Sequence, residues 1–165
     1  MPSSNTTQLT KRPRILVVDD DPGQRSLLDS FLKSQGFETK VVASGEQALA
    51  ALRAEGFAMM ISDVRMPGIS GLETLRQARK EFTRLPVLLV TAFADIRDAV
   101  DAMRDGALNY LSKPIDLDEL LRHVQQATGL AKPAESLPQL LKKRDVRLIL
   151  AYQVLAAIGT HLVIF

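Results

Sequence analysis

The sequence predicts an α/β domain in which helices cover both faces of a five-stranded parallel sheet. Short apolar runs alternate five times with longer amphipathic segments between residues 14 and 127, which is the pattern of strand–helix units joined by right-handed crossovers. The chain has 165 residues, of which 46% are hydrophobic and 24% are charged. That length is sufficient for one well-buried core with a shorter segment left over.

The first half of the domain is predicted to hold two strands and two helices. The apolar run RILVV at residues 14–18 suits a strand buried on both faces. The segment FETKVV at residues 37–42 is more polar, so we expect a strand at the edge of the sheet. One helix is predicted from Pro22 to Gln35, and another opens at Ser44 and ends at Gly56.

The second half continues the alternation with three strands and three helices. The strands are predicted at residues 57–62, 86–92 and 107–112. Two of the helices are predicted at residues 72–82 and 116–127, and the remaining one carries Ile96, Val100 and Met103 at helical spacing.

Composition limits the chemistry that the chain can support. It has no cysteine and two histidines, so disulfides, thiolate metal sites and multi-histidine zinc centres are excluded. A metal ion would therefore bind to oxygen. The net charge is +2, yet residues 14–130 hold 14 Lys and Arg against 17 Asp and Glu. Because the positive excess lies at the two ends, we do not expect the central domain to bind nucleic acid.

Reactive or charged residues follow four of the five predicted strands. They are Asp19, Asp20 and Asp21 after the first strand, Asp63 after the third, Thr91 after the fourth and Lys113 after the fifth. Ligands of sheets of this kind lie beyond the carboxyl ends of the strands. We therefore expect these side chains to form one site.

The crowded aspartates predict a bound cation, because neighbouring carboxylates repel one another unless a positive charge lies between them. Asp19, Asp20 and Asp63 would form an oxygen-only site for Mg²⁺ rather than Ca²⁺, since few protein ligands leave room for water and a phosphoryl group. Lys113 and Thr91 suit phosphoryl oxygens. A carboxylate at the centre of such a site can become an aspartyl phosphate.

Four segments resemble the receiver domain of bacterial two-component response regulators. They are VVDDD, SDVRMPGISGLE, LLVTAFAD and NYLSKPIDLDEL. They occur in the order that the family has, and the likeness covers residues 13–129. The stretch AVDAMRDGALNYLSKPIDLDELL looks most like receivers attached to ATPase transcription activators of the nitrogen-regulation type. The resemblance implies the flavodoxin-like receiver fold and a signalling module rather than an enzyme with a separate substrate.

The resemblance also implies roles for the acidic residues. Asp63 would be the phospho-acceptor, which attacks the phosphohistidine of a sensor histidine kinase. Asp20 would bind Mg²⁺ directly and Asp19 mainly through water, with Asp63 and the backbone carbonyl of Arg65 as further ligands.

Three other residues acquire roles from the same resemblance. Lys113, in a cis peptide bond to Pro114, would pair with the phosphoryl group. On activation Thr91 would move toward a phosphoryl oxygen, and Tyr110 would follow it from exposed to buried. The face formed by the fourth helix, the fifth strand and the fifth helix would then signal to a partner or to a second copy of the chain.

An alternative resemblance is to haloacid-dehalogenase-like phosphatases, in which VVDDD would supply Asp19 as nucleophile and Asp21 as acid. That family also needs a later acidic pair on a strand, whereas Asp116 and Asp118 begin a helix. Asp21 has a second interpretation in either family, because an aspartate before Pro22 can cap the first helix.

The two ends of the chain are expected to lie outside the receiver. Residues 1–12 are polar, lack the apolar core of a secretory signal and favour a flexible lead-in to a cytoplasmic protein. Residues 130–138 are interpreted as a linker and residues 139–165 as an apolar helix. Three interpretations of this helix stay open: packing on the receiver or a second copy, a membrane anchor at residues 146–165, or the remnant of a truncated regulator.

Overall fold

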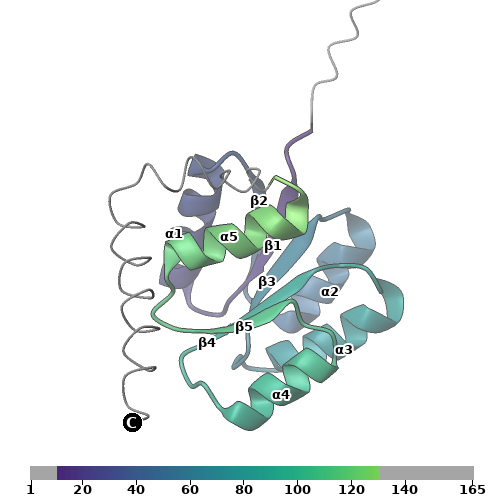
Figure 1. Ribbon diagram of the computed structural model, residues 1–165. Coiled ribbons are helices and arrows are strands. Elements are labelled where there is room, and N and C mark those ends of the chain that lie inside the picture. Colours follow the sequence, from purple (N-terminus) through teal and green to yellow (C-terminus); the bar gives the residue numbers. More distant parts are fainter. Residues whose placement is uncertain (1–10, 131–165) are drawn as a thin grey trace, which may run out of the picture. The chain divides into compact units, whose positions relative to one another are not determined.

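The computed structural model describes residues 11–130, which form five strands that alternate with five helices (Figure 1). The strands are β1 (Arg14–Val18), β2 (Glu38–Val42), β3 (Met59–Asp63), β4 (Val87–Thr91) and β5 (Asn109–Ser112). The helices are α1 (Pro22–Ser34), α2 (Gly45–Ala54), α3 (Gly71–Glu81), α4 (Ile96–Arg104) and α5 (Leu117–Thr128).

The five strands are parallel and lie in the order β2-β1-β3-β4-β5. The chain runs outward from β1 to β2 and then crosses back to β3 on the other side of β1, which makes the sheet doubly wound. The predicted fold is thereby confirmed. β1 has the predicted bounds, whereas β3 begins at Met59 rather than at residue 57 and includes Asp63 as its last residue.

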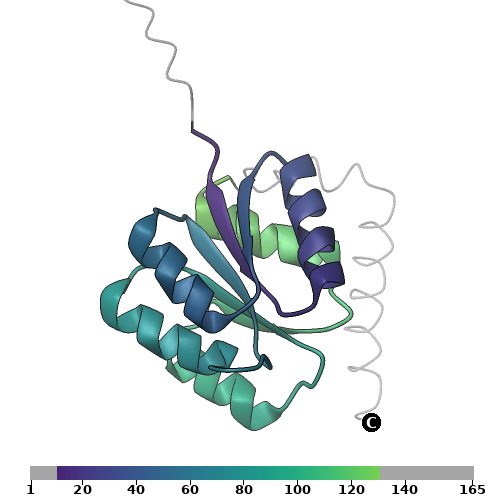
Figure 2. The ribbon, with the colours of Figure 1, turned by 180° about the vertical axis from the view of Figure 1, so that it is seen from behind.

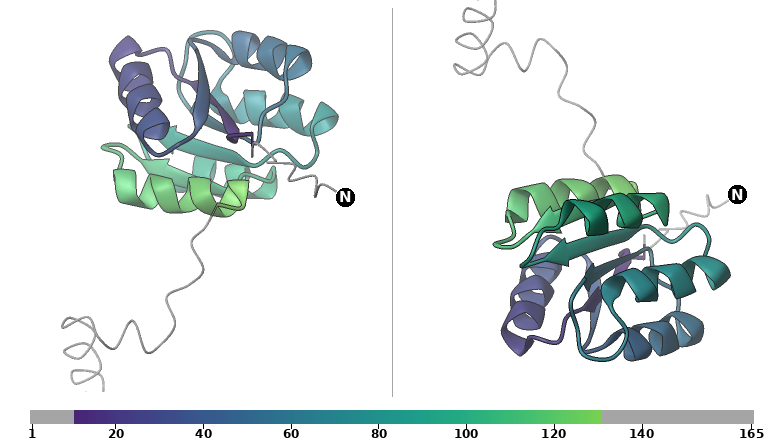
Figure 3. Two further views of the ribbon diagram at one scale, coloured as in Figure 1. Left: turned by 90° about the horizontal axis from the view of Figure 1, so that it is seen from above. Right: turned by 90° about the horizontal axis from the view of Figure 1, so that it is seen from below.

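Helices cover both faces of the sheet, as the views from behind, from above and from below show (Figures 2 and 3). Alternate residues of β1 point to opposite faces: Ile15 packs with the apolar side chains of α1 and α5, and Leu16 packs with those of α2 and α3. Both are fully buried. The two clusters make the sheet the rigid centre of the domain, from which the loops at its carboxyl edge project.

Each helix is preceded by a residue whose side chain accepts a hydrogen bond from an N–H of the first turn, which satisfies donors that the helix itself leaves unpaired. These residues are Asp21, Ser44, Ser70, Asp95 and Asp116. The cap residues fix where each loop ends and therefore how far the loops at the carboxyl edge extend.

Helix α4 presents its apolar residues outward, which the sequence pattern alone does not reveal. Ile96, Val100 and Met103 are 84%, 43% and 50% exposed, and Ala102 is the buried residue of this helix. A helical stripe of apolar residues ordinarily faces the core. Here small residues make the contact with the sheet, and the large ones form a surface.

The predictions for the two ends of the chain lie outside the described residues. These are residues 1–10 of the predicted lead-in, residues 131–138 of the predicted linker and the apolar helix at residues 139–165. Within residues 11–130, none of the helices has the length and hydropathy that crossing a bilayer requires.

Candidate functional site

The carboxyl ends of β1, β3, β4 and β5 bring together the side chains that the sequence singled out. β1 lies beside β3, β3 beside β4 and β4 beside β5, so residues that follow each strand meet at one edge of the sheet. The register pairs Asp63 with Val90, one residue before Thr91, and pairs Thr91 with Ser112, one residue before Lys113.

Asp19, Asp20 and Asp63 form an acidic cluster, in which one carboxylate oxygen from each residue lies within 4.8 Å of the others. Asp19 is 3% exposed and Asp63 8% exposed, whereas Asp20 is open to solvent. Two carboxylates at the edge of the core and one facing water form a shallow site with an open side.

Lys113, the residue that follows β5, bonds to two members of this cluster. Its Nζ donates to Asp19 Oδ2 at 2.9 Å and to Asp63 Oδ2 at 3.1 Å. Burial acts to lower the pKa of Lys113, but hydrogen bonds to the two carboxylates outweigh it and raise the pKa above its usual value. Lys113 is therefore a permanent positive charge at the site. Its peptide bond to Pro114 is cis, as the resemblance to receiver domains implied.

Its surroundings act on the pKa of the Asp63 carboxyl in opposite directions. Burial raises the pKa of its carboxyl above the usual range, and the nearby charge of Asp19 acts in the same direction. The hydrogen bond from Lys113 and a weaker one from the Arg65 N–H, 3.3 Å from Asp63 Oδ1, act to lower it. A carboxylate that is incompletely neutralised in this way has affinity left for a further cation.

The charge of the cluster fits a divalent ion. Three carboxylates face one ammonium group, since Lys113 is the only cationic side chain of residues 11–130 that hydrogen-bonds to any of them. The site thus has an excess of two negative charges and offers only oxygen ligands. Hard divalent cations prefer that donor set, and the open side leaves room for water ligands of the kind that Mg²⁺ keeps.

Asp21 does not join the cluster. Its Oδ1 accepts from the Gly23 N–H at 2.8 Å and caps α1, so the capping interpretation is the one that the structure supports. Asp19 in turn accepts from the Asp21 N–H at 2.9 Å. Asp21 therefore differs from its two neighbours, because its carboxylate turns toward the helix.

Thr91 is the last residue of β4, and Tyr110 lies on β5 three residues before Lys113. Thr91 is fully buried, and its Oγ1 accepts from the Phe93 N–H at 3.2 Å. Tyr110 packs against the core cluster beneath α4, and its hydroxyl oxygen is buried with no hydrogen-bond partner among residues 11–130. Burial raises the pKa of Tyr110. Tyr110 as a whole is half-buried, so its predicted change from exposed to buried stays a prediction.

Two side-chain contacts beside the site were not predicted from the sequence. Arg25 on α1 donates from Nη1 to the Asp19 carbonyl at 2.6 Å, which fixes the chain where β1 ends. The Arg65 guanidinium lies 5.2 Å from the centre of the Phe93 ring, within reach of a cation–π contact between the loops that follow β3 and β4. Neither pair has a sequence signal, since each depends on which loops the sheet order makes neighbours.

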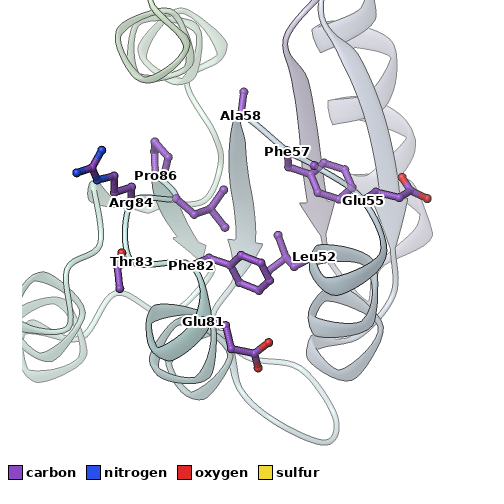
Figure 4. A pocket seen from close by; sticks show the side chains of 11 residues that line it. Leu52, Glu55, Phe57, Ala58, Glu81, Phe82, Thr83, Arg84 and Pro86 are labelled. Carbon is purple, nitrogen blue, oxygen red and sulfur yellow. The ribbon is translucent and has the colours of Figure 1, made fainter.

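A separate hollow of about 470 Å³ lies at the opposite edge of the sheet, where β3 and β4 begin. Figure 4 shows Phe57 and Phe82 in its wall, with Glu55 and Glu81 at its margin. Both carboxylates are engaged in ion pairs, Glu55 with Lys40 and Glu81 with Arg53. The hollow shares no residue with the acidic cluster and is not part of this site.

Comparison with known proteins gives the same picture as the geometry. The family model described as "Response regulator receiver domain" matches residues 15–125. Regulatory protein AtoC of Escherichia coli is 41% identical over 122 residues, which cover 74% of this chain and 26% of that protein. The DNA-binding transcriptional regulator NtrC of Salmonella typhimurium is 38% identical over 117 residues, covering 71% of this chain and 25% of NtrC. The chain thus spans about a quarter of the length of these relatives.

Among solved structures, the response regulator protein TrrA of Thermotoga maritima matches with a TM-score of 0.65 and 36% identity, over 70% of this chain and 98% of that one. The expected likeness to regulators of the nitrogen-regulation type is confirmed. The phosphatase alternative finds no support, because the matched family is a different one and Asp21 is engaged as a cap. The chain belongs to the response regulator receiver domain family.

Proposed function

We propose that this chain is the phosphoryl-accepting receiver of a phosphorelay, in which Asp63 takes a phosphoryl group from the phosphohistidine of a sensor histidine kinase. The observation that carries the proposal is the convergence of Asp63 with Asp19, Asp20 and Lys113 at the carboxyl edge of the sheet. Family membership supports it. On this proposal the chain is a signalling module, which catalyses only its own phosphorylation and dephosphorylation.

In the proposed transfer, an Asp63 carboxylate oxygen forms a bond to phosphorus as the P–N bond to the donor imidazole breaks. The electron pair of the broken bond returns to the imidazole nitrogen. Lys113, whose Nζ already lies 3.1 Å from Asp63 Oδ2, would neutralise charge on the phosphoryl oxygens. Thr91 would donate its hydroxyl hydrogen to one of them.

We assign Mg²⁺ as the cofactor. Asp20 and Asp63 would bind it directly, Asp19 mainly through water, and the backbone carbonyl of Arg65 would complete the protein ligands. The excess of two negative charges on the cluster supports this assignment. When bound, Mg²⁺ would stabilise the negative charge of the transferring phosphoryl group. The similar protein TrrA from Thermotoga maritima has a crystal structure in complex with Mg(2+)-BeF.

The proposed switch connects the site to the surface formed by α4, β5 and α5. For Thr91 to donate to a phosphoryl oxygen, its hydroxyl would have to give up its hydrogen bond to the Phe93 carbonyl oxygen, which is 3.4 Å long. That movement would change the surroundings of Tyr110, whose buried hydroxyl lacks a partner within residues 11–130. A partner protein or a second copy would then recognise the changed surface at the exposed apolar residues of α4, which are Ile96, Val100 and Met103.

Partners and location belong to the same proposal. We place the chain in the cytoplasm with a sensor histidine kinase as donor. We propose that the described domain makes no direct contact with nucleic acid. The relative NtrC is named a DNA-binding transcriptional regulator, and AtoC a regulatory protein. This chain spans about a quarter of their length, so we do not propose that it has their full activities.

Binding of beryllofluoride, a stable mimic of the phosphoryl group, tests the assignment. We expect the full chain to bind it only when Mg²⁺ is present, with a shift of the amide resonances of Thr91 and Tyr110 in NMR spectra. Asp63→Asn should abolish the shift, since no anionic oxygen remains for the beryllium. Binding that survives in Asp63→Asn but fails in Asp19→Asn would refute the choice of Asp63.

A further inference from the structure

The loop between β3 and α3, residues 64–70, follows Asp63 directly and contains Arg65. Its base is closed by the backbone: the Gly71 N–H donates to the Val64 carbonyl at 2.8 Å. A Cβ on Gly71 would collide with the Asp63 carbonyl oxygen, so the two ends of the loop lie against each other. Backbone contacts therefore fix the base, but they do not reach the tip.

The tip of this loop is held by Glu46, which comes from the first turn of α2. The Ile69 N–H donates to Glu46 Oε1 at 3.0 Å. At Gly68 the backbone has φ +80°, and a Cβ there would collide with the same carboxylate oxygen. Within residues 11–130, Glu46 is the one side chain from outside residues 63–74 that hydrogen-bonds to the backbone of the loop.

The start of α2 is packed closely against the same loop. A Cβ on Gly45 would collide with Thr74 Oγ1 and lie 2.6 Å from Ile69 Cγ1. Ile69 is partly buried against the apolar cluster that α2 and α3 share. Since α2 itself packs on the sheet, a side chain in its first turn is a rigid point of attachment for the tip of the loop.

The Glu46 carboxylate is well suited to accept hydrogen bonds. Its own backbone N–H and that of Ile69 hold the pKa of Glu46 below its usual value. It also lies in the first turn of α2, where the helix dipole favours a negative charge. The acceptor is therefore ionised at neutral pH, and bonds to an ionised acceptor are the stronger kind.

We propose that Glu46 is a positioning residue of the phosphoryl-accepting site. It fixes the tip of the β3–α3 loop, so that Asp63 and Arg65 keep their places relative to Asp19 and Asp20. This role rests on the proposed function of Asp63. This role predicts that loss of the hydrogen bond between Glu46 and Ile69 lowers the Mg²⁺ affinity and the phosphorylation rate. Glu46 itself would touch neither the metal nor the phosphoryl group.

Three substitutions in the full chain test the role. Glu46→Ala removes the carboxylate, Glu46→Asp keeps the charge but withdraws it from Ile69, and Glu46→Gln keeps an acceptor oxygen at the same reach. Gln47→Ala is the matched control, because Gln47 Oε1 accepts from the Ala43 N–H at 2.9 Å in the same helical turn and does not bond to the loop.

The measurements are the Mg²⁺ dissociation constant by calorimetry and the rate of phosphorylation by acetyl phosphate. We expect Glu46→Ala and Glu46→Asp to weaken Mg²⁺ binding by about tenfold, the lower range for residues that support metal ligands. Phosphorylation at a fixed subsaturating Mg²⁺ concentration should slow in proportion, and saturating Mg²⁺ should recover most of the rate. Gln47→Ala should behave as the unchanged chain does, and Glu46→Gln should lose less Mg²⁺ affinity than the Ala and Asp variants, because its neutral oxygen still accepts from Ile69 but makes the weaker bond.

The outcomes separate this role from the proposed function. If the unchanged chain neither binds Mg²⁺ nor accepts a phosphoryl group, the proposed function fails. If it does both and the Ala and Asp variants equal it, only the role of Glu46 is refuted. An equal loss in Gln47→Ala would also refute that role, since the effect would then belong to α2 as a whole. If Glu46→Ala does not fold, the other two Glu46 variants test the role. The role then requires weaker Mg²⁺ binding in Glu46→Asp than in Glu46→Gln.

Discussion

Lys113 is the residue that makes the acidic cluster compatible with a folded chain. Its ammonium group bonds to both Asp19 and Asp63, which are almost fully buried. Leaving such carboxylates without a cation costs free energy, because water no longer solvates them and they repel each other. The cluster therefore depends on positive charge, from Lys113 or from a bound ion.

The substitution Lys113→Met tests this dependence. Without Mg²⁺ we expect the free energy of unfolding to fall by about 1–3 kcal/mol, the usual cost of an unsatisfied buried group. Mg²⁺ should stabilise the variant more than the unchanged chain, since the site then has three uncompensated negative charges. Urea denaturation with EDTA and with Mg²⁺ measures both effects. Lys80→Met, at an exposed position, is the control, and equal behaviour of the two variants would contradict the account.

At the scale of elements, Asp29 ties helix α1 to the edge strand β2. Its carboxylate accepts from the Thr39 hydroxyl and from Lys33 Nζ. The Thr39 hydrogen bond is the largest influence that lowers the pKa of Asp29 below its ordinary value of 3.8, and Lys33 adds to it. A lowered pKa means that the ionised form stabilises the fold above pH 3.8, and that this contribution is lost as the pH falls through the lowered pKa.

Asp29→Asn should therefore lower the free energy of unfolding at pH 7 by about 0.5–1 kcal/mol, the size of a single partly exposed hydrogen-bonded pair. The difference in the free energy of unfolding between Asp29→Asn and the unchanged chain should become smaller as the pH falls below 3.8. Urea midpoints at pH 7, 5 and 3 measure it. Thr39→Val should reproduce the loss at pH 7, and a gap that stays constant down to pH 3 would show that the charge of Asp29 is not involved.

Helix α4 shows what the sequence could not predict about elements. Its apolar periodicity correctly predicted a helix, but Ile96 and Met103 face solvent while Ala102 packs inward. Periodicity reports that one side of a helix is apolar, whereas the buried side also depends on how closely the helix approaches the sheet. The strand bounds had smaller errors, because Phe57 and Ala58 are apolar yet precede the ladder that begins at Met59.

At the scale of the whole domain, the order of elements and the residues of the site were predictable for a common reason. Five strand–helix alternations allow few topologies, and each places the strand ends at one edge. That rule predicts from the sequence that Asp19, Asp63 and Lys113 lie close together. It could not predict the Arg25 and Glu46 contacts, which depend on side-chain reach between loops that are distant in sequence.

The most direct measurement of the central claim is the site of phosphorylation. The full chain is incubated with acetyl phosphate and Mg²⁺, and mass spectrometry locates the added group after proteolysis. We predict one phosphoryl group per chain on Asp63, with none in the presence of EDTA and none in Asp63→Asn. Equal labelling of Asp63→Asn, or a label on Asp19, would contradict the account.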